Sequence, residues 1–401
     1  MGNKQPEMII LLVILVILEL LTFLSLAEHY SKGSRLKYYI ILLINILCSL
    51  WVWIVFIKVT TFKGDFDTPR NVVSRMDLTL LVCAVLIPRF ILTFLHFTGR
   101  LLRIKKGGHS KPITRAGILL GIIVLAIVGA STLFGRFNFR TEEVTVKIEG
   151  LDPRLEGLKI VQLSDMHLAS FYRHKRRLEK VIGKVNNLSP DLIINTGDFV
   201  SYGWREFDRC DTILAKSESR FGSLAILGNH DMGTYLPGLS DAERRANLNR
   251  MKELIAASGY RLLDNENIVL DINGAGIEFA GVETAGRFPD MIHTEIDNSI
   301  SGTDSADLSI ILIHDPNQWK KDITGKTDFD LALAGHTHGM QIGILTRKIR
   351  WSPAKYIYPE WNGLFTDGDQ YLYVNRGLGV LGVPFRIWMP PEITLLTLTA
   401  G

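Results

Sequence analysis

The sequence predicts an α-helical transmembrane bundle over residues 1–140, followed by an α/β domain over residues 141–401. Two observations indicate this fold class. Long apolar stretches fill the first third of the chain, whereas from Thr141 onward apolar strands alternate with polar turns and amphipathic helices. A length of 401 residues suits this division, because a single core usually stops growing at roughly 250 to 300 residues.

Four apolar stretches in the first third each approach the roughly 20 residues that a helix needs to cross a bilayer. They cover residues 8–27, 38–57, 78–97 and 117–134. A cleaved signal peptide is the alternative for the first stretch, because "SLA" at residues 25–27 resembles a cleavage site. The run exceeds the roughly 7 to 15 residues of a signal-peptide core, however, and further candidate spans follow it. We therefore expect four retained transmembrane helices.

The basic residues between these stretches predict an orientation. The first and third connections carry nine of them: Lys32, Arg35, Lys37, Arg100, Arg103, Lys105, Lys106, Lys111 and Arg115. The opposite side carries seven: Lys4, Lys58, Lys63, Arg70, Arg75, Arg136 and Arg140. Because positive residues favour the cytoplasmic side, the α/β domain is expected to be extracytoplasmic. A net charge of +4 without a concentrated basic stripe gives no reason to expect a nucleic-acid partner.

Two charged residues fall inside predicted spans, Glu19 in the first and Arg89 in the third. Charges in a membrane are costly, so a functional or a paired role is expected. We favour a structural Glu19–Arg89 pair over a functional role.

The cysteines exclude two kinds of site. Cys48 and Cys83 lie in apolar runs, which leaves Cys210 alone in the remainder of the chain. Neither a disulfide framework nor a thiolate metal site is therefore expected, and any metal must use nitrogen and oxygen ligands.

The segment 173–188 is the clearest amphipathic helix of the second part. Leu178, Val181, Ile182, Val185 and Leu188 recur with helical spacing and form one apolar stripe beside a charged face. A helix of this kind covers one face of a sheet.

Five apolar, β-rich runs of the second part end in side chains that can bind metals. These are "LKIVQLSDMH" with Asp165 and His167, "DLIINTGD" with Asp198, "SLAILGNHD" with Asn229, His230 and Asp231, "LSIILIHDP" with His314, and "LALAGHTH" with His336 and His338. Each residue alone is more often a turn, a cap or an ordinary loop residue. Because binding crevices of α/β sheets form beyond the carboxyl ends of strands, five such ends predict one shared site.

The ordered motifs D-x-H, G-D, G-N-H-D, a later His before Asp-Pro, and G-H-T-H resemble those of the calcineurin-like metallophosphoesterases. The resemblance runs from about residue 144 to 398 and includes "YVNRGLG" and "PPEITLLTL", which are similar to the membrane-associated bacterial branch. It implies a four-layer α/β/β/α sandwich with two metal ions between the strand ends. One departure is Met340, which stands where that branch often has a second glycine.

The resemblance also implies roles for individual residues. Asp165, His167 and His338 would hold the first ion, Asn229, His314 and His336 the second, and Asp198 would bridge them. These donors suit Mn²⁺, Fe or Zn²⁺. His230 would act as general acid or donor to the leaving oxygen, and Asp231 would accept from its other ring nitrogen and fix the tautomer.

Three further features are expected to have structural rather than catalytic roles. For Arg376 and Arg386, salt bridges are favoured over contact with substrate. An aromatic-rich stretch contains Trp351, Tyr356, Tyr358 and Trp361. We expect these side chains to be half-buried in packing, and we favour this interpretation over a pocket wall or a membrane-facing lip.

The predicted function is a membrane-anchored, dinuclear metal-dependent phosphoesterase that acts on a phosphomonoester or phosphodiester. Its membrane part suggests a lipid-linked substrate, although anchoring alone could localise an enzyme of soluble phosphoesters. One alternative is a pyrophosphatase of the UDP-diacylglucosamine type. Another is a non-catalytic membrane module that binds a partner, and a transporter ranks last because the spans lack a repeated half.

Overall fold

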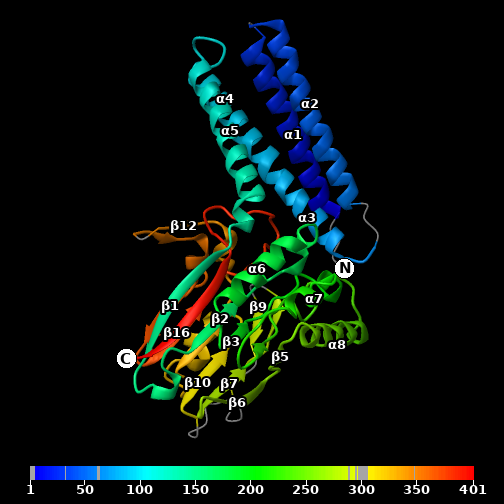
Figure 1. Ribbon diagram of the computed structural model, residues 1–401. Coiled ribbons are helices and arrows are strands. Elements are labelled where there is room, and N and C mark those ends of the chain that lie inside the picture. The colour runs from blue at the N-terminus through cyan, green and yellow to red at the C-terminus, as the bar shows by residue number, and fades with distance from the viewer. Residues whose placement is uncertain are drawn as a thin grey trace. The chain divides into compact units, whose positions relative to one another are not determined.

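The computed structural model describes residues 5–31, 33–60, 64–287, 290–293, 296, 306–346 and 348–401. The chain divides into two compact units, residues 1–64 with 74–133, and residues 65–73 with 134–401. Each unit is built from different elements, the first from helices and the second mainly from two sheets (Figure 1).

The helical unit contains the predicted spans. Its elements are α1 (Gln5–Tyr30), α2 (Arg35–Thr60), α3 (Pro69–Leu81) from residue 74 onward, the π-helical turn η1 (Val82–Leu86), α4 (Ile87–Leu101) and α5 (Lys111–Leu133). In the described part of the chain four helical segments are long and apolar enough to cross a membrane, and between 17% and 22% of each apolar window is buried. Most of their apolar side chains therefore face outward, as a lipid environment requires.

The charged residues inside the spans form the predicted pair. Arg89 Nη1 lies 3.4 Å from Glu19 Oε1, and Arg89 also donates to Asn45 O and Ser49 Oγ. Trp53 Nε1 donates to Glu19 at 3.0 Å. This ion pair and its hydrogen bonds satisfy two charges that would otherwise be costly between helices.

Small residues bring α4 and α5 together. A Cβ atom at Gly117 would lie 3.1 Å from Leu92 Cα, and one at Gly121 would lie 3.3 Å from Pro88 Cβ. The two glycines are four residues apart on α5, so they share one face of this helix.

The second unit contains two sheets, each with six strands in the described chain. The first has the order β1 (Arg140–Ile148), β16 (Glu392–Ala400), β2 (Lys159–Leu163), β3 (Leu192–Asn195), β4 (Ser223–Ala225) and β5 (Arg261–Leu262). The second has the order β14 (Gly363–Asp367), β15 (Gln370–Val374), β11 (Leu331–Ala334), β10 (Leu308–Leu312), β7 (Ala275–Gly281) and β6 (Glu266–Ile272).

Parallel pairing dominates both sheets. β16 runs parallel to β1 and antiparallel to β2, whereas β2, β3, β4 and β5 are parallel to one another. In the second sheet β7, β10, β11 and β15 are parallel, with antiparallel β6 and β14 at its edges. Short hairpins are β8 (Thr284–Arg287) with β9 (Asp290–His293) and β12 (Ile344–Leu345) with β13 (Arg350–Trp351).

Helices cover the outer face of the first sheet. They are α6 (Lys175–Asn187), α7 (Asp211–Leu214) and α8 (Asp241–Ala257). The predicted helix over 173–188 corresponds to α6, whose Leu178, Val181, Ile182 and Val185 are buried. Single 3-10 turns are η2 (Gly135–Phe137), η3 (Pro153–Leu155), η4 (Leu168–Phe171), η5 (Trp204–Phe207), η7 (His338–Gln341) and η8 (Pro353–Tyr356).

The main core lies between the two sheets, where Ile160 and Ile194 of the first pack with Phe279 and Ile310 of the second. A second core joins the first sheet to α6 and α8, and a third joins the second sheet to the π-helical turn η6 (Trp319–Ile323). The predicted α/β/β/α order is confirmed, although in the described chain the helical layer on the second sheet is short.

Candidate metal centre

The predicted site residues follow the carboxyl ends of five strands in both sheets. Asp165 and His167 follow β2, Asp198 follows β3, and Asn229, His230 and Asp231 follow β4. His314 follows β10, and His336 and His338 follow β11. Packing of the two sheets therefore brings together side chains as far apart in sequence as His167 and His338, whose Nε2 atoms are 3.0 Å apart.

The backbone is left-handed at several of these positions. The φ angles are 48° at Asp165, 39° at His167, 57° at Asp198, 70° at His336 and 49° at His338. Positive φ is uncommon for residues with a side chain and costs on the order of 1–3 kcal/mol at each position. Strain of this kind clusters at functional sites, where surrounding structure holds it in place.

Two glycines give the carboxylates room. A Cβ atom at Gly228 would collide with the Asp198 carboxylate, and one at Gly335 would collide with Ser164 Oγ and the Asp165 carboxylate. The G-N-H-D and G-H-T-H motifs thus need glycine because the carboxylates approach the backbone closely at these positions.

Asp165, His167 and His338 form one group, in which one ligand atom of each lies within 4.8 Å of the others. His338 Nε2 is 3.2 Å from Asp165 Oδ1 and 3.0 Å from His167 Nε2. All three side chains are buried. Two imidazole nitrogens and one carboxylate converge here on one point.

A second group contains Asp198, His314 and His336. His314 Nε2 lies 3.2 Å from Asp198 Oδ2 and 3.2 Å from His336 Nδ1. The same Asp198 Oδ2 lies 3.8 Å from His167 Nε2 of the first group. One carboxylate oxygen therefore faces both groups.

The side-chain oxygen of Asn229 is a buried acceptor without a hydrogen-bond donor among the described residues. The amide nitrogen Nδ2 of the same side chain donates to Tyr235 Oη at 2.8 Å. A buried acceptor without a donor costs about 1–3 kcal/mol, so the Asn229 oxygen is suited to a cation. The full donor set of carboxylate, imidazole and amide oxygen fits divalent metal ions such as Mn²⁺, Fe²⁺ or Zn²⁺.

The outer ring nitrogens of three histidines are held by their surroundings. His167 Nδ1 donates to Val200 O at 3.0 Å, and His314 Nδ1 donates to Thr196 O at 2.7 Å. His336 Nε2 lies 2.8 Å from Tyr358 Oη. Such contacts fix the ring orientation and leave the inner nitrogen to bind a metal.

The buried carboxylates and imidazoles of the site shift one another's pKa values. Burial alone would raise the pKa of Asp165, but the imidazoles of His338 and His314 hold it below its usual range. Burial opposes protonation of His314, yet the Asp198 carboxylate raises the pKa of His314 to about 10. A divalent cation that binds His314 must therefore displace a proton.

The predicted contact between Asp231 and His230 is wrong. His230 Nδ1 donates to the backbone carbonyl of Ser201 at 2.6 Å. Asp231 instead accepts from the backbone N–H groups of Asp198, Val200 and Gly228 at 2.8, 3.1 and 3.0 Å. Asp231 ties the loops after β3 and β4 together, because a short buried carboxylate finds three nearby amides there.

Of the two arginines predicted to form salt bridges, Arg376 does so in the described chain and Arg386 makes other contacts. Arg376 pairs with Glu142 at 2.6 Å and with Glu392 at 3.0 Å. The buried Arg386 donates instead to the carbonyl oxygens of Gly377 and Gly379, and its Nη2 lies 3.2 Å from His338 Nδ1. Arg386 thus packs directly against a predicted metal ligand.

The aromatic-rich stretch divides by exposure. Tyr358 and Trp361 are buried and pack with Ala354 and Met389, and Met340 is partly buried against this cluster. Tyr356 is 73% exposed. Sequence reasoning missed Tyr235, whose ring stacks on His230 with centroids 4.2 Å apart. Its position four residues after Asp231 gives no signal of this contact.

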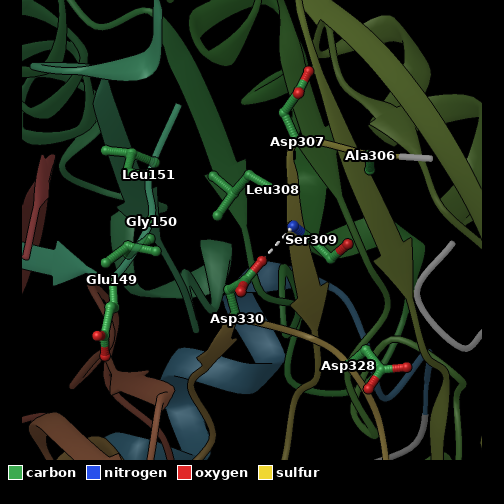
Figure 2. A pocket seen from close by; sticks show the side chains of 10 residues that line it. Glu149, Gly150, Leu151, Ala306, Asp307, Leu308, Ser309, Asp328 and Asp330 are labelled. Carbon is green, nitrogen blue, oxygen red and sulfur yellow. Dashed lines mark hydrogen bonds between the residues drawn. The ribbon is translucent and has the colours of Figure 1, made fainter. Parts of the chain in front are cut away.

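A separate pocket of about 270 Å³ lies near the N-terminal ends of β10 and β11 (Figure 2). Its lining includes the carboxylates of Glu149, Asp307, Asp328 and Asp330, and Asp330 accepts from Ser309 N at 2.8 Å. His314, His336 and His338 of the candidate metal groups follow the opposite, carboxyl ends of the same strands. A pocket lined by carboxylates repels a phosphate anion, so it does not suit a phosphoester.

Comparison with known proteins identifies the family. Residues 158–340 match the model of the calcineurin-like phosphoesterases. The uncharacterized metallophosphoesterase YkuE of Bacillus subtilis is 31% identical over 305 residues, which cover 72% of this chain and 98% of YkuE.

Two further proteins are similar to this chain. A transmembrane protein with metallophosphoesterase domain from Danio rerio is 25% identical, with 83% of this chain and 75% of that protein covered. The UDP-2,3-diacylglucosamine pyrophosphatase LpxG of Chlamydia muridarum is 28% identical, with 69% and 96% covered. The two candidate metal groups and these matches agree, and the chain belongs to the calcineurin-like phosphoesterase family.

Proposed function

We propose that this chain is a membrane-anchored phosphoesterase that uses two divalent metal ions to hydrolyse a phosphomonoester or phosphodiester. The observation that carries the proposal is the pair of ligand groups that share Asp198, with the unpartnered Asn229 Oδ1 nearby. Asp165, His167 and His338 would hold one ion, Asn229, His314 and His336 the other, and Asp198 would lie between them. Bound divalent ions supply Lewis acidity toward water and phosphoryl oxygens.

His230 is the proposed proton donor to the leaving oxygen. Its Nδ1 proton is committed to Ser201 O, so Nε2 is the nitrogen that can exchange a proton. Its backbone N–H donates to Asp198 Oδ1 at 3.0 Å, and Tyr235 stacks on its ring. These contacts fix the imidazole beside the proposed bridging carboxylate. Asp231 acts in this reaction by positioning the loops that carry Asp198 and His230.

A lipid-linked substrate is supported by an apolar rim next to the metal centre. Ile342 follows η7 directly, and its backbone pairs with Ile387. The rim exposes large apolar side chains, namely Ile342, Ile344, Ile349, Tyr356, Ile357 and Trp388. The pairings of Ile342 with Ile387 and of Ile344 with Trp351 bring parts of this rim together, and contiguous exposed apolar patches are typical of surfaces that contact lipid or another apolar ligand. The basic residues between the spans favour an extracytoplasmic site.

A pyrophosphatase that acts on a lipid-linked diphosphate is the second candidate. The relative LpxG is described as a UDP-2,3-diacylglucosamine pyrophosphatase, and that description favours a P–O–P bond. The same ligand set would serve either reaction, because both need a phosphoryl group between two cations.

The test is turnover by the purified full-length protein with Mn²⁺. Substrates would be p-nitrophenyl phosphate, bis-p-nitrophenyl phosphate and a lipid-linked nucleotide diphosphate. We expect metal-dependent turnover that Asp198→Asn abolishes, whereas Asp330→Asn in the separate acidic pocket leaves it intact. Preference for the diphosphate would support the pyrophosphatase. A protein that binds two metals and turns over none of the three substrates would instead be a binding module.

A further inference from the structure

A second concentration of metal-capable side chains lies in the helical unit. Glu28 is in the last turn of α1, His96 is in α4, and His109 lies in the connection between α4 and α5. One ligand atom of each lies within 4.8 Å of one from each of the others. This cluster forms where α1 and α4 end and α5 begins, and the motifs of the phosphoesterase domain do not include it.

Both imidazoles face the same carboxylate. His96 Nε2 is 3.3 Å from Glu28 Oε2, and His109 Nδ1 is 3.2 Å from Glu28 Oε1. The two rings have centroids 4.8 Å apart. His96 is 1% and His109 is 7% exposed, so water solvates these nitrogens poorly. Buried polar groups of this kind need a partner that neutralises or binds them.

The outer nitrogen of each ring has an acceptor of its own. Thr114 Oγ1 donates to Ser110 O and lies 3.1 Å from His96 Nδ1, so its lone pairs can accept the Nδ1 proton. His109 Nε2 lies 3.0 Å from His29 Nδ1, which can accept in the same way. With these protons placed outward, His96 Nε2 and His109 Nδ1 each direct a lone pair toward Glu28. Metal-binding histidines show this arrangement, in which the outer N–H is held and the inner nitrogen is free.

The spacing matches that of the candidate metal centre in the same protein. Its inner atoms are separated by 3.0 to 3.2 Å in the pairs His167–His338, Asp165–His338 and Asp198–His314. Ligands about 2.0–2.1 Å from a tetrahedral zinc ion are about 3.3 Å from one another. The distances of 3.3 Å from His96 Nε2 to Glu28 Oε2 and of 3.2 Å from His109 Nδ1 to Glu28 Oε1 are of the same size.

We propose that Glu28, His96 and His109 bind one divalent transition-metal ion, with Zn²⁺ the best fit, at this end of the helical bundle. Two imidazoles and a carboxylate are ligands that zinc commonly takes, and they leave a fourth position for water. Bound metal would link α1, α4 and the α4–α5 connection. The proposal is independent of the phosphoesterase activity, because none of its residues belongs to that site.

In the absence of a bound metal, Arg100 can neutralise the Glu28 carboxylate. Its Nη1 lies 3.2 Å from Glu28 Oε2, and its side chain is 57% exposed. In that state Arg100 and the protons of His96 and His109 would neutralise Glu28 through hydrogen bonds. An exposed side chain can move away when a cation replaces it, so removal of Arg100 should not weaken metal binding.

The experiment counts zinc on the full-length protein in detergent by plasma mass spectrometry, after equilibration with buffered free Zn²⁺. We expect about one equivalent less on His96→Gln and on His109→Gln than on the wild type. His174→Gln is the matched histidine control, because His174 lies outside all three candidate metal groups, and it should keep the wild-type count. Arg100→Gln should also keep it.

Equal zinc content in the wild type and both folded histidine variants would overturn the proposal and leave a hydrogen-bonded network. If a variant fails to fold, as judged by gel filtration, anomalous scattering at the zinc edge from wild-type crystals decides instead. A peak among Glu28, His96 and His109 supports the site, and its absence at saturating zinc refutes it.

Discussion

His230 has one ring nitrogen committed and one available. Its Nδ1 donates to Ser201 O, and its backbone N–H donates to Asp198. Its burial lowers the pKa of the imidazole, although the charge of Asp198 opposes that shift. Nothing in this arrangement requires His230 to hold a metal. The structure therefore allows proton transfer and metal binding to be separated by mutation.

His230→Ala should keep both metal ions in the phosphoesterase unit and lose turnover by a factor on the order of 10² to 10⁴, the contribution of general acid–base catalysis. Metal content and kcat measured on the same sample check this outcome. His174→Ala should change neither quantity. A loss of metal that parallels the loss of kcat would make His230 a ligand and refute its role as a proton donor.

Glu206 is a buried carboxyl group whose importance the sequence does not reveal. It accepts from the backbone N–H groups of Ser201, Tyr202 and Gly203 in the loop that holds His230. Burial raises the pKa of Glu206 to about 8, and the backbone hydrogen bonds only partly oppose this shift. The folded protein thus retains a proton here that the unfolded chain releases near pH 4.5.

This raised pKa predicts a pH dependence of stability. Because the folded-state pKa lies above the unfolded one, the stabilisation is complete below about pH 4.5 and is lost as pH rises through about 8. Glu206→Gln cannot titrate, so its free energy of unfolding should fall less over that window. Denaturant titrations at several pH values check this. Identical slopes for wild type and variant would show that Glu206 ionises normally.

At the scale of elements, the face of α5 that meets α4 is set by Gly117 and Gly121. Each lies within 3.1 to 3.3 Å, measured from an added Cβ, of α4 atoms. Gly129 lies on the same helix, but a Cβ there would meet no atom within 4 Å. Gly129 therefore serves as a control, on the same helix, for the close packing of Gly117 and Gly121 against α4.

Gly117→Leu should separate α4 from α5 and destabilise the helical unit by about 1–3 kcal/mol, the usual penalty of overpacking. Gly129→Leu should change stability far less, because its side chain enters open space. Thermal unfolding of both variants in the same detergent measures the difference. Equal destabilisation would mean that the effect arises from the loss of glycine itself rather than from helix contact.

The sequence predicted those helices and strands whose signal lies in residues close together along the chain. The stripe from Leu178 to Leu188 predicted α6, and β-rich runs predicted the strands that carry the site, because both signals depend on neighbouring residues. The place of β16 between β1 and β2 was not predictable, since strand order depends on pairings between distant residues. The partner of Asp231 was missed for the same reason, because three amides from two loops reach it only in the folded domain.

At the scale of the whole domain, the candidate metal centre belongs to neither sheet alone. β2, β3 and β4 supply Asp165, Asp198 and Asn229, whereas β10 and β11 supply His314 and His336. The core between the sheets fixes the distances between these two contributions. Substitutions in that core, far from any ligand, are thus able to change metal affinity.

The position of β16 has a consequence for synthesis. In the described chain β1 pairs along its nine residues with β16, and β16 separates β1 from β2. A polypeptide that is still attached to the ribosome therefore exposes one edge each of β1 and β2 until residues 392–400 emerge. Unpaired strand edges favour aggregation, so the pairing of β16 with both β1 and β2 removes two such edges in the last step of folding.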